Sequence, residues 1–307
     1  MSALISLPGQ RIVATASFDK TVILWDMDVF QKKEILRGDA PVKSISYGSD
    51  RLMACGPQSA IVFEVSSSIR SCVIGHGSGE TLVTGEIISF NETSEGNQIR
   101  AILADDRNNF RVYNINAAEA GSEDGETEPL QTFQVVEIGF GQLKSFLLTP
   151  STTSVWPTIH AVGTGRELVS FDAFRAEKAA MPVSMLFYNQ TLGSLVGVVG
   201  KDMKVWDMAT GAEERFITGL TNDEISAACF DMPLSKKLYI GTNTGKLFVV
   251  NFLSGQTILA SHLHSSCIVM IAFHSFTKHL ITVSSDSQIL ISVESQKGWC
   301  RKRTKGL

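Results

Sequence analysis

The chain has 307 residues, of which 44% are hydrophobic and 19% are charged, so it has enough apolar surface for a large core and is not a disordered protein. Its 27 basic and 31 acidic side chains leave a net charge of −4, which argues against nucleic acid or a membrane surface as the main partner. No apolar run approaches the roughly 20 residues of a membrane span, and residues 1–8 lack the features of an export signal.

In chain order, short apolar runs recur that mostly end in an aromatic residue followed by an acid or an amide. The first run (VILWD, residues 22–26) and the fifth (MKVWD, residues 203–207) end in Trp-Asp. Weaker copies of this run occupy residues 61–64, 110–114, 168–172, 247–251 and 289–293. Seven copies give a period of about 44 residues, which is typical of a repeat architecture.

Each copy is predicted to form four short β-strands separated by glycine, proline, asparagine or aspartate. The chain starts on such a strand at residues 3–7. In the sixth copy the segment 243–245 (NTG) is a tight hairpin turn between the second and third strands. The strands expected in the last two copies are residues 224–230, 237–241, 246–251 and 256–260, then 267–273, 279–284, 288–293 and 299–304. No stretch has the 3.6-residue period of a helix.

This pattern resembles the WD40 repeat family, whose members are β-propellers in which Trp-Asp ends the third strand of a blade. The resemblance implies an all-β chain, with a single seven-bladed propeller of four-stranded blades over residues 1–307. The expected blades are residues 1–38, 39–76, 77–138, 139–181, 182–219, 220–262 and 263–307. Within the third blade, residues 116–129 are rich in acids and lack aromatic residues, which predicts a disordered insertion.

In the WD40 family a histidine, a serine or threonine, the tryptophan and a turn aspartate form a buried hydrogen-bond network. The first copy offers Ser17, Asp19 and Trp25 but no histidine. The last copy has Ser292 in place of the tryptophan, and its other candidates are His262, His264, Ser284 and Asp286. We therefore expect most blades to depend on apolar packing. The aromatic residues expected to be buried are Trp25, Phe63, Tyr113, Phe171 and Trp206.

The expected way of closing the ring differs from that of many propellers, which complete one blade with strands from both chain ends. Here the chain begins on an innermost strand and ends on an outermost one. Closure then rests on side-chain packing alone, or the chain is a fragment of a longer protein. The amino-acid sequence of copies five to seven is also similar to that of large WD40 proteins of cilia and flagella.

No motif in the sequence predicts catalysis, a cofactor or a metal. The segment 75–79 (GHGSG) matches neither a nucleophile elbow nor a phosphate loop. His262 and His264 have no carboxylate or cysteine close in sequence to complete a metal site. Five widely spaced cysteines indicate a reducing, cytoplasmic compartment rather than a disulfide framework: Cys55, Cys72, Cys229, Cys267 and Cys300.

The sequence therefore predicts a non-catalytic scaffold that presents its loops to protein or peptide partners in a multiprotein assembly, in the cytoplasm or in a cilium. The expected binding residues lie in the turns between second and third strands: Asp19, Lys20, Arg107, Asn108, Arg166, Lys201 and Asn243. Among these, Arg107, Arg166 and Lys201 form a basic arc suited to an acidic peptide. The alternatives are nucleic acid or anionic lipid bound by the basic C-terminal tail, and a propeller hydrolase.

Overall fold

The structure is a computed structural model of the chain. It describes residues 1–75, 81–92, 96–106, 109–115, 131–134, 141–143, 146–149, 158–161, 167–170, 184–189, 191–208, 210–295 and 298–303. The described residues form strands and no helix, which confirms the all-β expectation. Accordingly, none of them belongs to a helix that could cross a membrane. The expected acidic insertion at residues 116–129 lies outside the described residues.

The strands are short, as the repeat predicts. In the first half of the chain they are β1 (Ala3–Ser6), β2 (Ile12–Ala16), β3 (Thr21–Asp26), β4 (Gln31–Arg37), β5 (Ser44–Gly48), β6 (Arg51–Cys55), β7 (Ser59–Glu64), β8 (Ile69–Gly75), β9 (Leu82–Glu92), β10 (Gly96–Asp105), β11 (Asn109–Asn114), β12 (Gln131–Gln134), β13 (Gly141–Leu143) and β14 (Phe146–Thr149). In the second half they are β15 (Thr158–Ala161), β16 (Glu167–Ser170), β17 (Met185–Asn189), β18 (Ser194–Val199), β19 (Asp202–Asp207), β20 (Glu213–Ile217), β21 (Ile225–Phe230), β22 (Lys237–Thr242), β23 (Lys246–Asn251), β24 (Thr257–His262), β25 (Ile268–His274), β26 (His279–Ser284), β27 (Ile289–Ser295) and β28 (Gly298–Arg303).

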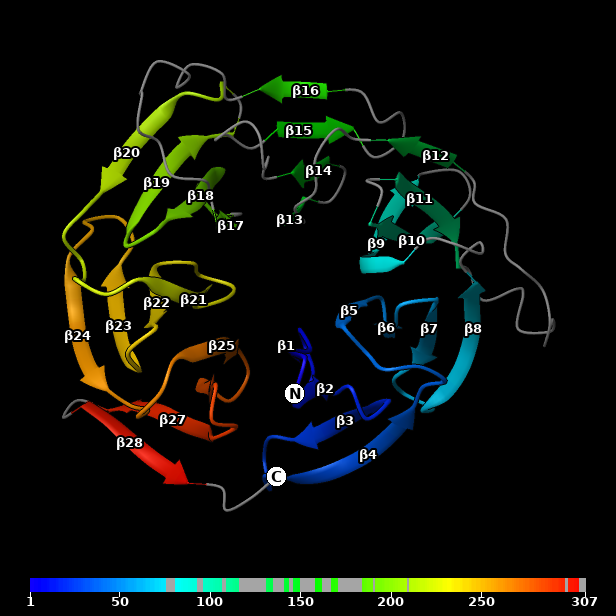
Figure 1. Cartoon of the computed structure of the whole chain (residues 1–307), viewed down its shortest axis with the longest axis horizontal. Helices are drawn as coiled ribbons and strands as arrows, with labels where there is room; N and C mark the ends of the chain where they lie inside the picture. The colour runs from blue at the N-terminus through cyan, green and yellow to red at the C-terminus, as the bar shows by residue number, and fades with distance from the viewer. Residues whose placement is uncertain are drawn as a thin grey trace.

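Within the described ranges, these strands pair into seven antiparallel sheets of four consecutive strands each, which we number sheet 1 (β1–β4) to sheet 7 (β25–β28). In every sheet the strands lie side by side in chain order, so the first and fourth strands are its edges. Figure 1 shows the sheets following one another around a common centre, with each first strand innermost and each fourth strand outermost. Sheet 7 lies beside sheet 1, and β25 contacts β1.

The core consists of apolar layers between neighbouring sheets. Second strands such as β2 and β6 are buried along their whole length because both of their faces are covered, whereas the outer strands β4 and β24 are largely exposed. One such layer joins sheets 5 and 6 through side chains that include Val196, Val205 and Ile240. A smaller layer joins sheets 7 and 1, so these two sheets are connected by side-chain packing.

The strands expected in the sixth and seventh copies are present, with ends that differ by one or two residues. The fourth copy is different, because residues 168–172 were predicted as a third strand whereas β16 is the fourth strand of its sheet. The short strands β13 and β14 pair with each other and take the first two places, which moves the later strands outward by one place.

Candidate interaction surfaces

Two faces of the ring carry different connections. Strand direction alternates within each sheet, so the turns between second and third strands lie on the same face as the links to the next sheet. We call this the link face. The turns between first and second strands, and between third and fourth strands, lie on the opposite face. A backbone hydrogen bond shows that links and second-to-third-strand turns share a face. Gly38 N, in the link after β4, donates to Lys20 O in the β2–β3 turn at 2.8 Å.

The binding residues predicted from sequence divide into two groups. Asp19, Lys20, Lys201 and Asn243 are exposed in turns between second and third strands, so they lie on the link face. Arg107, Asn108 and Arg166 lie outside the described residues. Of the predicted basic arc, only Lys201 is therefore described, and the arc stays a prediction.

Aspartates on the link face stabilise turns between second and third strands. Asp19 Oδ1 accepts hydrogen bonds from the Thr21 hydroxyl at 2.6 Å and from Thr21 N at 3.0 Å. These bonds lower the pKa of Asp19 below its ordinary value. Asp223 accepts from Lys246 Nζ and from the Thr244 hydroxyl, both at 2.9 Å, and its pKa is lowered mainly by the Lys246 bond. Both carboxylates therefore have partners within the chain.

The hydrogen-bond networks predicted from the WD40 resemblance use other partners than expected. Trp25 Nε1 donates to the Thr15 hydroxyl at 2.9 Å, and not to Ser17. His264 Nε2 lies 2.8 Å from the Thr282 hydroxyl, whereas the Ser284 hydroxyl donates to Asp286. The reason is position along the strand: Thr15 and Thr282 lie inside their strands, while the two predicted serines lie at or beyond strand ends and serve the turns.

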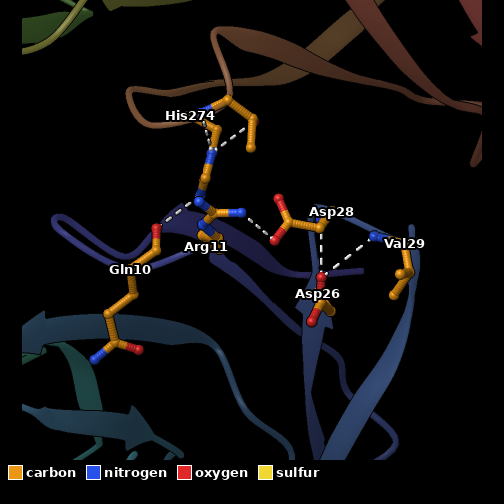
Figure 2. A network of polar contacts seen from close by, with 7 residues as sticks. Gln10, Arg11, Asp26, Asp28, Val29 and His274 are labelled. Atoms are coloured by element: carbon orange, nitrogen blue, oxygen red, sulfur yellow. Dashed lines mark hydrogen bonds and ion pairs between the residues drawn. The ribbon is translucent and has the colours of Figure 1, made fainter.

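Sheets 7 and 1 are joined on the opposite face by a buried histidine (Figure 2). His274 is fully buried, its Nε2 lies 3.0 Å from Gln10 O, and its Nδ1 accepts a hydrogen bond from Thr277 N at 3.2 Å. A carbonyl can only accept and an amide N–H can only donate, so the ring is neutral with its proton on Nε2. Desolvation accordingly lowers the pKa of His274.

An ion pair continues this network within sheet 1 (Figure 2). Arg11 Nη1 lies 2.5 Å from Asp28 Oδ2, and Asp26 Oδ1 accepts hydrogen bonds from the backbone N–H groups of Asp28 and Val29. Both partners of the pair are about half exposed, with side-chain exposures of 53% and 40%, so the pair contributes little to stability by itself.

A cavity of about 220 Å³ separates sheets 1 and 7 beside this network. Its lining is mostly apolar: Leu4, Val13, Thr15, Trp25, Asp26, Met27, Phe30, Ile281, Ile289 and Ile291. Trp25 is only partly buried because it borders this cavity, which corrects the expectation that it is a core residue. Phe63, Tyr113 and Trp206 are buried as predicted, and Phe171 lies outside the described residues.

Hydroxyl side chains in or next to the innermost strands link neighbouring sheets. Ser2 donates to Val42 O at 2.6 Å, Ser226 donates to Ile268 O at 2.6 Å, and Ser46 donates to Glu86 Oε2 at 2.8 Å. Part of Glu86 is exposed, but its carboxyl is withdrawn from water, and this desolvation raises its pKa to about 7. An isolated acid in the apolar run LVTGEIISF was the sequence signal for this group, whereas nothing in the sequence marked His274.

Two cysteine thiols have pKa values that burial raises. Burial raises the pKa of the Cys55 thiol to about 12 and raises that of Cys229 as well, so both are protonated and unreactive at neutral pH. Within the described ranges, no group of three His, Cys, Asp or Glu side chains is arranged to hold a metal ion.

Comparison with known proteins gives a limited result. No family model matches the chain. A stretch of 120 residues is 25% identical to cilia- and flagella-associated protein 337 B of Tetrahymena thermophila. The match spans 39% of this chain and 9% of that protein, so the chain is similar to a small part of a longer ciliary or flagellar protein.

Proposed function

We propose that the chain is a seven-bladed β-propeller of the WD40 type and acts as a non-catalytic scaffold for protein partners in a ciliary or flagellar assembly. The observation that carries this proposal is the arrangement of sheets 1 to 7 around one centre with short turns on both faces (Figure 1). Such a ring holds many loops in fixed relative positions, which suits simultaneous contact with several partners.

Two further observations support parts of the proposal. The sequence repeat and the sheets have the same order, with Trp25 and Trp206 on third strands as in WD40 repeats. The partial similarity to a cilia- and flagella-associated protein supports the cellular location. Fold alone does not determine function, so location and partners need a direct test.

Proximity labelling in ciliated cells tests the proposal. The chain is fused to a biotin ligase, and labelled proteins are compared with those labelled by the ligase alone. We expect axonemal proteins to be enriched by the fusion. The same labelled set for the fusion and the free ligase would contradict the proposal, as would substrate turnover by the purified chain in a broad hydrolase screen.

A further inference from the structure

Large exposed hydrophobic side chains are unevenly distributed between the two faces. Among the described turns, the link face carries Phe18, which is 62% exposed. The turns of the opposite face carry Val29, Leu192, Met232, Leu234, Leu253 and Phe276, and Ile69 is the first residue of β8. Five of these come from consecutive sheets 5, 6 and 7, and we call them the apolar patch: Leu192, Met232, Leu234, Leu253 and Phe276.

The turns of sheets 5 and 6 that carry the apolar patch are fastened to each other. Asn189 is fully buried, and its Oδ1 accepts hydrogen bonds from the N–H groups of Thr191 and Leu192, both at 3.1 Å. Its Nδ2 donates to Ser235 O in the next sheet at 3.0 Å. This one amide therefore places Leu192 beside the turn that holds Leu234.

Leu253 and Phe276 are also held in place while remaining exposed. Arg215 on β20 donates from Nη1 to Leu253 O at 2.7 Å, across the boundary between sheets 5 and 6. The Arg11 guanidinium lies 4.3 Å from the centre of the Phe276 ring, across the boundary between sheets 7 and 1. Because these contacts use backbone carbonyls and a ring face, they fix the turns and leave apolar surface facing water.

The charges in the turns of the patch are predominantly positive. Lys236 follows Leu234 and Lys278 follows Phe276 by two residues each, and both lysines are exposed. Asp231 is the acid in these turns, and its Oδ1 already accepts a hydrogen bond from Lys237 N at 2.7 Å. The exposed surface is thus apolar with cations beside it.

We propose that the apolar patch docks an acidic amphipathic segment of a partner protein, with its apolar side chains on the patch and its carboxylates near Lys236 and Lys278. This inference names the partner chemistry for the scaffold and so rests on the proposed function. Five exposed apolar side chains in turns of one face favour a binding site there, and charge complementarity decides which partner fits it.

The same charges disfavour two other occupants. An isologous dimer would bring Lys236 and Lys278 of one copy close to the same residues of the other, which is repulsive. Anionic membranes are bound by clusters of about four to eight basic residues, more than these turns supply.

Peptide selection followed by binding measurements tests the proposal. The full chain is used to select binders from a random-peptide phage library, and fluorescence anisotropy then measures a selected peptide. We expect selected peptides to combine carboxylates with large apolar residues. The double variants Leu234→Ser/Phe276→Ser and Lys236→Glu/Lys278→Glu should each weaken binding by about tenfold or more. Phe18→Ser is the matched control, because it removes an equally exposed ring from the link face and should leave binding unchanged.

Other outcomes overturn the proposal. Selected peptides without acids, or native affinity in both double variants with unchanged melting temperature, would do so. Binding of the chain to phosphatidylserine vesicles, or dimerisation in ultracentrifugation that either double variant abolishes, would assign the patch to a membrane or to a second copy. Enrichment of axonemal proteins together with any of these results leaves the scaffold function standing and removes only this site.

Discussion

Burial separates the two tryptophans that end third strands. Trp206 has 0% exposed surface, whereas Trp25 borders the cavity between sheets 1 and 7. The sequence motif is the same in both, so the difference comes from the neighbouring sheet. At the scale of single residues, the loss of stability on substitution therefore depends on how closely the neighbouring sheet packs against the side chain.

We expect Trp206→Ala to lower the free energy of unfolding by about 3 to 5 kcal/mol, because it removes a fully buried aromatic side chain. Trp25→Ala should cost clearly less, since part of that side chain is not in contact with protein. Urea denaturation followed by circular dichroism measures both. Equal losses would show that the cavity does not reduce the packing of Trp25.

Glu86 predicts a pH dependence of stability. Its pKa is raised from 4.5 to about 7 in the folded chain, so between these values the folded state holds a proton that the unfolded state has released. The contribution of Glu86 to stability is therefore present below about pH 4.5 and is lost as the pH rises toward 7. Glu86→Gln should remove this dependence.

Urea unfolding of the two proteins at pH 5 and pH 7.5 checks this expectation. The stability difference, native chain minus Glu86→Gln, should decrease as the pH rises. Ser46→Ala serves as a control that keeps the carboxyl and deletes its hydroxyl partner. A difference independent of pH would mean that the Glu86 carboxyl is solvated.

At the scale of elements, side-chain amides organise the turns of the opposite face. Asn189 and Asn251 each end a strand, and each accepts hydrogen bonds from two N–H groups of the following turn. Asn189 alone of this pair is fully buried and also donates across to sheet 6. Asn251 thus stabilises one turn, whereas Asn189 stabilises its own turn and contacts a turn of sheet 6.

Asn189→Ala should lower the free energy of unfolding by about 1 to 3 kcal/mol, because buried backbone groups lose their partners. Asn251→Ala, at a more exposed position, should have a smaller effect. Hydrogen exchange should show faster exchange at Leu192 and in the turn after β21 in the first variant only. Unchanged exchange in both turns would show that Asn189 does not couple sheets 5 and 6.

At the scale of the whole molecule, the boundary between sheets 7 and 1 is the joint without a covalent link. His274 and Gln10, the small apolar layer and the cavity occupy this boundary. By contrast, sheets 5 and 6 share a larger continuous apolar layer. We therefore expect the ring to open first at the boundary between sheets 7 and 1, and better packing there should stabilise it.

Filling the cavity should stabilise the ring. Val13 lines the cavity, so we expect Val13→Ile to raise the free energy of unfolding by about 0.5 to 2 kcal/mol. Val196→Ile is the matched control, since it adds the same methylene to the packed layer between sheets 5 and 6 and should destabilise by about 1 to 3 kcal/mol. Thermal unfolding compares them, and destabilisation by Val13→Ile would show that the cavity cannot accept the added group.

The sequence by itself determined most of the strands and their order, because hydrophobic runs, turn residues and their period are local properties of the chain. It predicted the all-β class and the strands of the last two copies. It misplaced residues 168–172, because the weak hairpin of β13 and β14 carries no repeat signature. Only the tertiary structure decided which side chains meet: His274 with Gln10, Asn189 with Ser235, Ser46 with Glu86, and Trp25 with a cavity. These contacts join residues about 40 or more positions apart, so they depend on how the sheets pack around the centre, which no local pattern specifies.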